Sequence, residues 1–243
     1  MARGSDKTGN MIRCIFMDID NTILDFDAFV EYAMREGFRE FGLPAFREDM
    51  LPVFHETNTV LWNAIEQGTG TLDDVRANRW NLIFAKLGFK ADGPAFEEYF
   101  RQTLHETTIP VPGAPQLIRY LSGRYVLCAA SNGPYEQQVY RMRKAGLSDY
   151  FLKLFISEEI GASKPSAAFF DRCISQLNED AQFSKQPLHP EEILMLGDSL
   201  TADIDGAVGY GLKTCYYDRS AEGTKGRHVD YYVTDLRELT QIL

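Results

Sequence analysis

The stretch FMDIDNTILDFD, residues 16–27, places four carboxylates directly after an apolar run. The acidic residues are Asp18, Asp20, Asp25 and Asp27. Like charges held close together repel, and a buried carboxylate is costly unless a positive group accompanies it. The stretch therefore predicts either a solvated turn after a strand or a site that holds a cation. The rest of the chain decides between these alternatives.

The residues that follow this stretch show helical spacing up to about position 106. Apolar side chains recur every three or four positions in segments 26–34 and 53–65, as on one face of a helix. The segment 71–80 begins with Thr71 and Asp74, a pair that resembles a capping box. We expect a helical block without strands here.

Beyond residue 110 short apolar runs alternate with helical segments. The runs expected to be strands, with the one that precedes the helical block, are 12–18, 125–130, 152–157, 192–197 and 213–217. Continuously apolar strands between helices indicate a parallel sheet covered on both faces. We therefore expect an α/β fold: a doubly wound, Rossmann-like parallel sheet core with an inserted all-helical domain. The expected boundaries are 1–24 and 107–243 for the core and 25–106 for the insertion.

Composition narrows the class of protein. The chain has 243 residues, 44% of them hydrophobic, which is typical of a globular protein with a sizeable core. Its formal net charge of -10 argues against a nucleic-acid polymer as partner, because duplex binding needs a broad basic face. No apolar run reaches the length of a membrane span, so no membrane partner is expected. The opening MARGSDKTGN is polar and predicts a loose tail rather than a secretory signal.

The cysteines and histidines are dispersed along the chain. The cysteines are Cys14, Cys128, Cys173 and Cys215. They lack the spacing of a zinc site or a disulfide framework, so we expect buried free thiols and a cytoplasmic location. The histidines are equally scattered, which argues against a histidine metal site or a Ser-His-Asp triad.

Polar residues stand where the expected strands end. They are Asp18 and Asp20; Ser131, Asn132 and Gly133; Lys164; and Asp198 and Asp203. In an open parallel sheet ligands bind beyond the carboxyl ends of the strands, so these residues should converge. Asp18 and Asp198 have the oxygen ligands that Mg2+ prefers. A carboxylate can also act as a nucleophile, and a second one two positions on as general acid and base. Lys164, the Ser131 hydroxyl and nearby main-chain N–H groups suit a phosphoryl group.

Several of these residues, and other polar and aromatic residues of the chain, also have a purely structural interpretation. Asp18 and Asp20 alone would fit a turn, and Ser131-Asn132-Gly133 is an ordinary turn sequence. For Asp25 and Asp27 we favour solvation or helix capping, and for Asp205 a place near a helix amino end. The two tryptophans, Trp62 and Trp80, fit packing at least as well as stacking on a base.

The order of these motifs resembles the haloacid-dehalogenase superfamily, in its phosphatase branch. The matching segments are DIDNT from Asp18, ASNG with Ser131, SKPSAAFF with Lys164, and GDSLTADIDGA with Asp198 and Asp203. The resemblance makes the helical block a cap domain and Mg2+ the cofactor. It implies that Asp18 is nucleophile and metal ligand, and that Asp20 is general acid and base with its main-chain carbonyl on the metal. Asp198 would be the third protein ligand. Thr22, Ser131 and Lys164 would orient the phosphoryl group, with Asp203 supporting the metal waters or Lys164. Asn132 is a candidate substrate-binding residue through its main-chain N–H, because it follows an expected strand.

A finer resemblance concerns the cap. DIDNTILDFD, TNTVLWNAIEQG and RANRW together are similar to the bacterial pyrimidine 5′-nucleotidase subfamily. The match includes Asn58, a candidate substrate-binding residue, and Leu61-Trp62, whereas Arg79-Trp80 stands where the subfamily usually has Arg-Phe. The resemblance implies a cytoplasmic, Mg2+-dependent phosphomonoester hydrolase of nucleoside 5′-monophosphates, a monomer or weak homodimer. The alternatives are a phosphatase of another small metabolite, such as a sugar phosphate or phosphoglycolate, and a non-catalytic sensor of a phosphorylated ligand.

Overall fold

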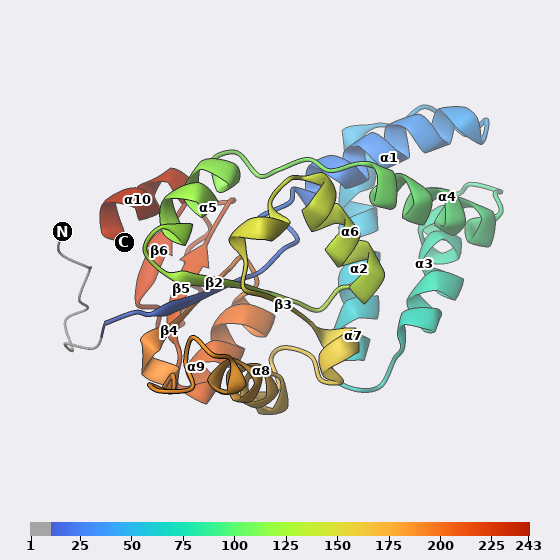
Figure 1. Cartoon of the computed structure of the whole chain (residues 1–243). Helices are drawn as coiled ribbons and strands as arrows, with labels where there is room; N and C mark the ends of the chain where they lie inside the picture. Colours follow the sequence, from blue (N-terminus) through green and yellow to red (C-terminus); the bar gives the residue numbers. More distant parts are fainter. Residues whose placement is uncertain (1–10) are drawn as a thin grey trace. The chain divides into compact units, whose positions relative to one another are not determined.

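The computed structural model describes residues 11–243, so the expected polar tail at residues 1–10 lies outside the described residues. The chain forms two compact units (Figure 1). The sheet unit combines the residues up to Asp25 with Pro110–Leu243, and the helical unit is Phe26–Ile109. The insertion therefore follows the first strand and its loop, and builds a body with a core of its own.

The sheet unit is organised around a six-stranded parallel sheet with the order β3-β2-β1-β4-β5-β6. The strands are β1 (Cys14–Met17), β2 (Val126–Ser131), β3 (Lys153–Ile156), β4 (Ile193–Gly197), β5 (Lys213–Tyr217) and β6 (Tyr231–Val233). The expected parallel α/β architecture is confirmed. The edge strand β6 was not expected, because its three residues are too short a run to show a periodicity.

Helices cover both faces of the sheet (Figure 1). One face packs against α5 (Ala114–Ser122), α6 (Tyr135–Lys144) and α10 (Leu239–Ile242). The other face packs against α7 (Ser157–Ile160), α8 (Ala167–Glu179) and α9 (Gly206–Tyr210). Strand β1 shows why its sequence is continuously apolar. Ile15 and Met17 join the core on one face, while Cys14 and Phe16 join the core on the other.

Several short helical turns connect these elements. A π-helical turn at Leu200–Asp205 leads into α9. The 3₁₀ turns are Glu48–Met50, Ser148–Tyr150, Pro190–Glu192 and Leu236–Glu238. The polar segment 178–192 is not wholly exposed, because its own Phe183 and Leu188 are buried.

The helical unit contains only helices among its regular elements, as expected: α1 (Phe26–Glu40), α2 (Leu51–Glu66), α3 (Leu72–Leu87) and α4 (Gly93–Glu106). Its core is a cluster of aromatic rings in which Trp80 is buried and lies 4.3 Å from the Phe96 ring centroid. The expected capping box at the start of α3 is confirmed. Thr71 Oγ1 accepts from the Asp74 N–H at 3.1 Å, and the Thr71 N–H donates to the Asp74 carboxylate at 2.8 Å.

Candidate active site

The carboxyl end of β1 carries the loop that holds Asp18, Asp20 and Thr22. The register pairs Met17 with Leu196 of β4 and with Ala129 of β2, so these strands end beside one another. The loop turns back on itself through hydrogen bonds from the N–H groups of Ile23 and Leu24 to the Ile19 carbonyl, each 2.8 Å long. Asn21 adopts a φ of 61°, a left-handed conformation that asparagine tolerates better than most residues. The loop conformation therefore follows from local sequence.

Lys164 lies at the centre of the site and is 1% exposed. Its Nζ donates to Asp18 Oδ1 at 2.6 Å, to Asp203 Oδ1 at 2.5 Å and to the Ala130 carbonyl at 2.6 Å. Burial alone would lower the pKa of Lys164, but the charges of Asp18 and Asp203 raise it above its ordinary value. A charged lysine thus joins the ends of β1, β2 and β4.

Asn132 fixes the loop that carries this lysine. Its side-chain Oδ1 accepts from the Lys164 N–H at 2.9 Å, and its Nδ2 donates to the Lys164 carbonyl at 2.8 Å. The Asn132 side chain therefore holds the main chain of Lys164. The Gly133 N–H, expected to face a phosphoryl group, donates instead to Ser131 Oγ at 3.1 Å.

Three carboxylates gather around the lysine. Asp18, Asp198 and Asp203 each place one oxygen within 4.8 Å of the others. Burial raises the pKa of Asp18 to about 7 against the opposing charge of Lys164, and the charge of Asp203 adds to the rise. Burial, and then the charges of Asp18 and Asp203, raise the pKa of Asp198 well above its ordinary value. One lysine does not balance three carboxylates, so the cluster has an excess of negative charge.

The donor set fits a hard divalent cation. Asp203 is already engaged on both oxygens, since Oδ1 accepts from Lys164 and Oδ2 accepts from the Ser199 N–H at 3.0 Å. Gly197 permits this approach, because a side chain there would collide with Asp203. Asp18 and Asp198 remain as the carboxylates able to hold the ion, and Thr22 Oγ1 donates to Asp198 Oδ1 at 3.3 Å. Buried carboxylate oxygens in excess of positive charge are what Mg2+ binds in proteins.

Asp20 lies beside this cluster and accepts hydrogen bonds from helix α6. Arg141 Nη1 donates to its Oδ1 at 2.7 Å, and Gln138 Nε2 donates to its Oδ2 at 2.6 Å. The same Gln138 nitrogen donates to Ser131 Oγ at 2.9 Å. Asp20 and Ser131 are therefore linked through one buried amide.

The sheet unit brings together eight of the nine residues whose side chains were candidates for catalysis or for binding substrate or metal. They are Asp18, Asp20, Thr22, Ser131, Asn132, Lys164, Asp198 and Asp203. The ninth, Asn58, belongs to α2 of the helical unit. There its Oδ1 accepts from Arg79 Nη1 at 3.1 Å. Arg79 in turn forms a buried ion pair with Glu97, with Nη2 and Oε1 2.6 Å apart.

Sequence reasoning did not find Gln138, Arg141 or Arg219, and it expected only local roles for Asp25. Gln138 and Arg141 were not singled out, although their i, i+3 spacing places both on one side of α6. Asp25 was expected to be solvated or to cap a helix. The solvation is wrong, whereas its place directly before α1 is that of a capping residue. Asp25 is 7% exposed and accepts from Arg219 Nη2 at 2.7 Å, while Arg219 Nη1 donates to Asn21 Oδ1 at 2.9 Å. A partner 194 positions away leaves no local signal.

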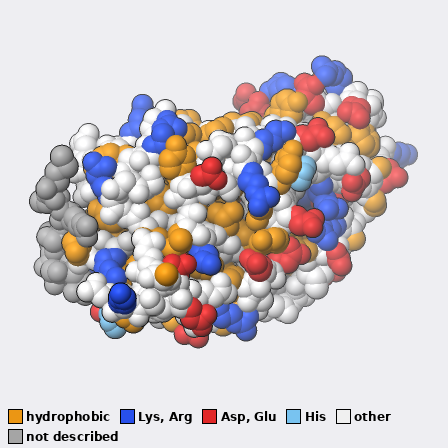
Figure 2. Space-filling model, viewed as in Figure 1, with side chains coloured by type: hydrophobic (Ala, Val, Ile, Leu, Met, Phe, Trp, Pro, Cys, Tyr) orange, Lys and Arg blue, Asp and Glu red, His pale blue; other side chains and the backbone are white. Residues whose placement is uncertain are grey.

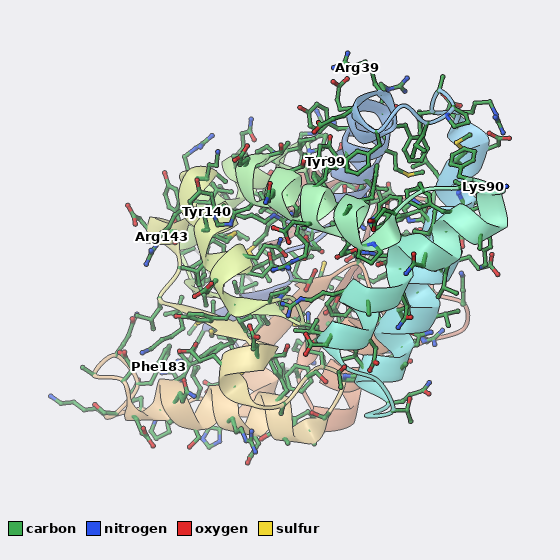
Figure 3. The ribbon with its side chains drawn as sticks, turned by 90° about the vertical axis from the view of Figure 1, so that its right-hand side faces the viewer. Arg39, Lys90, Tyr99, Tyr140, Arg143 and Phe183 are labelled. Carbon is green, nitrogen blue, oxygen red and sulfur yellow. The ribbon has the colours of Figure 1, made fainter. Side chains whose placement is uncertain are left out.

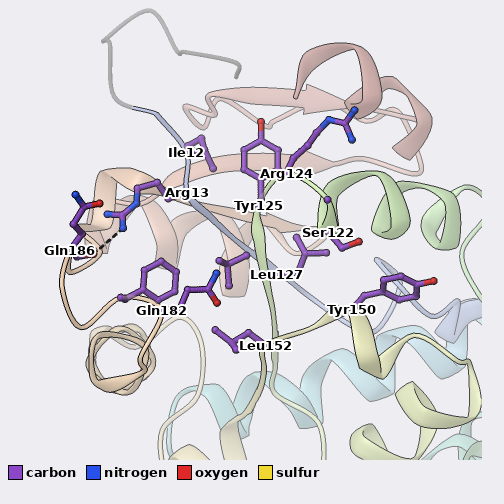
Figure 4. A pocket seen from close by; sticks show the side chains of 13 residues that line it. Ile12, Arg13, Ser122, Arg124, Tyr125, Leu127, Tyr150, Leu152, Gln182 and Gln186 are labelled. Carbon is purple, nitrogen blue, oxygen red and sulfur yellow. Dashed lines mark hydrogen bonds between the residues drawn. The ribbon is translucent and has the colours of Figure 1, made fainter. Parts of the chain in front are cut away.

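A separate pocket of about 550 Å³ lies at the amino ends of the strands, where β1, β2 and β3 begin (Figure 4). Arg13 lines it but is already engaged, because it donates to the Gln186 carbonyl at 2.9 Å and pairs with Glu192 at 3.1 Å. This pocket is not the candidate site, because in a parallel sheet of this kind ligands bind at the carboxyl ends of the strands.

The charge distribution on the surface says less about function than the candidate site does. On the face seen in Figure 2, Lys and Arg side chains are interspersed with Asp and Glu, the pattern of an ordinary protein surface. No helix within residues 11–243 is both long enough and apolar enough to cross a bilayer.

Comparisons with known proteins agree with this geometry. Residues 12–211 match the family model described as haloacid dehalogenase-like hydrolase. The putative HAD-hydrolase YfnB of Bacillus subtilis is 34% identical, with 95% of each chain covered. Its crystal structure bound to magnesium aligns with a TM-score of 0.83 at 32% identity, covering 95% of this chain and 98% of that one.

Two further relatives carry a named activity. Pyrimidine 5′-nucleotidase PynA of Streptococcus pneumoniae is 33% identical, covering 84% of this chain and 83% of its own. Pyrimidine 5′-nucleotidase YjjG of Escherichia coli is 29% identical, covering 94% and 96%. These matches confirm the resemblance that the sequence motifs indicated.

Proposed function

Because the chain belongs to the haloacid dehalogenase-like hydrolase family, we propose that it is a Mg2+-dependent phosphatase of nucleoside 5′-monophosphates. The observation that supports this most directly is the buried Lys164, shared between Asp18 and Asp203 beside Asp198. A positive charge is thereby fixed next to a carboxylate nucleophile, at the position where a phosphoryl group would gain negative charge in the transition state. The relatives named as pyrimidine 5′-nucleotidases support the substrate class.

The reaction would proceed in two steps. In the first, an Asp18 oxygen forms a bond to phosphorus, the bond from phosphorus to the leaving oxygen breaks, and Asp20 gives that oxygen a proton. In the second, Asp20 takes a proton from water, the water oxygen bonds to phosphorus, and the bond to Asp18 breaks to release phosphate. Lys164 places its positive charge beside the phosphoryl group throughout, and the Ser131 hydroxyl donates to one of the phosphoryl oxygens.

Asp18, Asp198 and the main-chain carbonyl of Asp20 would hold the Mg2+ ion. When bound, the ion supplies positive charge that reduces the repulsion between Asp18 and a phosphate ester. Asp203 keeps Lys164 in place, because both of its oxygens are occupied by Lys164 and by the Ser199 N–H.

We assign the choice of leaving group to the helical unit, acting as a cap domain. Arginine only donates hydrogen bonds, so the contact with Arg79 fixes Asn58 with its oxygen toward the guanidinium. The Asn58 amide is then oriented to use its N–H2 group as a donor, which suits a carbonyl oxygen of a pyrimidine base.

The buried free thiols Cys14, Cys128, Cys173 and Cys215 suit a reducing cytoplasm, where we propose that the protein acts as a monomer or weak homodimer.

The first test asks whether the protein is an enzyme of this kind. Hydrolysis of 4-nitrophenyl phosphate is measured with Mg2+, then after EDTA, and then after Mg2+ is restored. We expect turnover that disappears with EDTA and returns with the metal. A purified, folded protein with no metal-dependent turnover would favour the alternative, a sensor of a phosphorylated ligand.

The second test concerns the substrate. A panel containing UMP, dUMP, CMP, purine monophosphates, sugar phosphates and phosphoglycolate is compared by kcat/KM. We expect the pyrimidine monophosphates to rank first. Faster turnover of a sugar phosphate than of any pyrimidine monophosphate would refute the nucleotide assignment and leave the phosphatase mechanism intact.

An Asn58→Ala variant should raise KM for the preferred nucleotide more than for 4-nitrophenyl phosphate, which has no base.

A further inference from the structure

Helix α6 holds the Asp20 carboxylate at both of its oxygens. Arg141 Nη1 lies 2.7 Å from Oδ1, and Gln138 Nε2 lies 2.6 Å from Oδ2. The two donors also bind each other, since Arg141 Nη1 donates to Gln138 Oε1 at 2.8 Å. We call these two residues the α6 clamp. Because both oxygens accept a hydrogen bond, rotation of the Asp20 side chain would break the bond to buried Arg141 or the bond to buried Gln138.

The clamp is built into the interior, whereas other polar side chains of the same helix face solvent. Arg141 is 2% exposed and Gln138 is 1% exposed. Tyr140 and Arg143 lie on the outer side of α6, where Figure 3 shows them. Gly133 makes room for the glutamine, because any side chain at that position would collide with the Gln138 amide. The approach of Gln138 therefore depends on the absence of a side chain in the loop after β2.

Burying Arg141 is unfavourable for stability, so a contribution to stability does not explain why this arginine lies in the interior. Its Nε is buried and finds no hydrogen-bond partner among the described residues. A buried donor without a partner is unfavourable by about 1–3 kcal/mol. The Nη1 of this buried arginine lies on the carboxylate expected to transfer protons, which indicates a role in placing that carboxylate.

Gln138 connects Asp20 to the phosphoryl-binding hydroxyl. Because arginine only donates, the Gln138 amide must turn its oxygen to Arg141 and its N–H2 group to Asp20 and Ser131. Ser131 Oγ accepts from Gln138 at 2.9 Å and from the Gly133 N–H at 3.1 Å, which uses both of its lone pairs. The Ser131 proton then points away from both donors, as a donor for a phosphoryl oxygen.

We propose that Gln138 and Arg141 are positioning residues that hold Asp20 where it can protonate the leaving oxygen, and that Gln138 also directs the Ser131 hydroxyl. This inference rests on the proposed phosphatase function. It adds to it by assigning the placement of the general acid to one helix of the sheet unit.

The test uses esters that differ in how much they need an acid. Phenyl phosphate, 4-nitrophenyl phosphate and 2,4-dinitrophenyl phosphate share a phosphoryl group, but their leaving groups need progressively less protonation. The full-length Arg141→Met and Gln138→Leu variants are compared with the wild type by kcat/KM. We expect a loss of about 10–100-fold on phenyl phosphate and less than about 3-fold on the dinitrophenyl ester, because general acid catalysis matters only for a poor leaving group.

Three controls separate positioning from a general structural effect. Arg143→Met removes an exposed arginine two positions along the same helix and should behave as wild type on every ester. Arg141→Lys keeps the charge and should recover part of the loss on phenyl phosphate. In an Asp20→Asn background, Arg141→Met should cause no further loss, because residues that act through one group are not additive.

The variants are expected to fold, because the Asp20 side chain is 33% exposed and water can replace the guanidinium. If thermal unfolding shows that Arg141→Met does not fold, Gln138→Leu and Arg141→Lys decide the question. Equal losses on all three esters, or additive losses with Asp20→Asn, would overturn the clamp while the phosphatase function stands. A wild-type protein without turnover on any ester would overturn the proposed function, and the clamp with it.

Discussion

Each unit of this protein buries charged side chains, and the two units do so differently. In the helical unit Arg79 and Glu97 form a pair with two hydrogen bonds, 3.0 Å for Nε to Oε2 and 2.6 Å for Nη2 to Oε1. The arginine also lies over the Phe100 ring, 4.6 Å from its centroid. In the sheet unit, Lys164 stands among Asp18, Asp198 and Asp203. The first cluster pairs one acidic group with one basic group, whereas the second has three carboxyl groups around a single lysine.

A raised pKa does not distinguish these clusters. Burial raises the pKa of Glu97 against the opposing charge of Arg79, just as burial raises the pKa of Asp18. What differs is whether a partner within the protein completes the charge. A balanced pair can serve structure alone, whereas an excess of buried carboxylates calls for something that the chain does not provide. Charge balance is therefore the better criterion for a functional site.

The largest effect should come from Asp18→Asn. It removes the proposed nucleophile, and we expect kcat on any phosphate ester to fall by at least about 10³-fold. Because it also removes one charge from an overcharged cluster, the midpoint of thermal unfolding should stay the same or rise. Near-normal turnover would show that Asp18 is not the nucleophile. A large drop in the unfolding midpoint would show that the three carboxylates do not repel one another.

Lys164→Met should affect both activity and stability. The substitution leaves three carboxylates without their positive partner, and we expect a loss of roughly 3–5 kcal/mol in the free energy of unfolding without metal. Denaturant unfolding with and without Mg2+ measures it, and the metal should restore part of the loss. Exposed Lys86→Met in the helical unit is the matched control and should change stability little. An unchanged stability in Lys164→Met would mean that the lysine is not needed to hold the carboxylates together.

Arg79→Met tests the balanced cluster. The single change leaves Glu97 buried without its partner and should lower the free energy of unfolding by about 3 kcal/mol. Adding Glu97→Leu should recover most of that loss, because the double variant buries no unpaired charge. The same rescue should fail in the sheet unit, where no single carboxylate is the partner of Lys164. If the double variant is no more stable than Arg79→Met, the pair contributes more than charge compensation.

Addition of Mg2+ gives the smallest of these effects. A ligand that binds only the folded state at about 100 times its dissociation constant stabilises it by about 2.7 kcal/mol. We expect a shift of this order in the wild type and in Arg79→Met/Glu97→Leu, measured by thermal unfolding, and a much smaller one in Asp198→Asn. A full shift in Asp198→Asn would place the ion elsewhere.

The sequence was informative where chemistry follows a strand. Asp18, Ser131 and Asp198 could be placed at one edge because parallel strands end together, and the registers of β1 with β2 and β4 bring those ends level. Gln138 and Arg141 could not be placed, because a helix presents polar side chains in every direction and only packing decides which point inward. Arg219 was missed for a similar reason, since its contact with Asp25 joins residues 194 positions apart. The roles assigned to the site residues remain predictions that the experiments above test.

The way Asn132 is held has a consequence for how the protein ages. An asparagine followed by glycine is prone to lose its amide, because the glycine nitrogen attacks the side chain to form a succinimide. In the fold, the Asn132 amide is tied to the main chain of Lys164 and the Gly133 N–H is tied to Ser131. Folding should therefore protect this dipeptide from deamidation, and peptide mapping of native and unfolded samples stored side by side should find the modification at Asn132 mainly in the unfolded one.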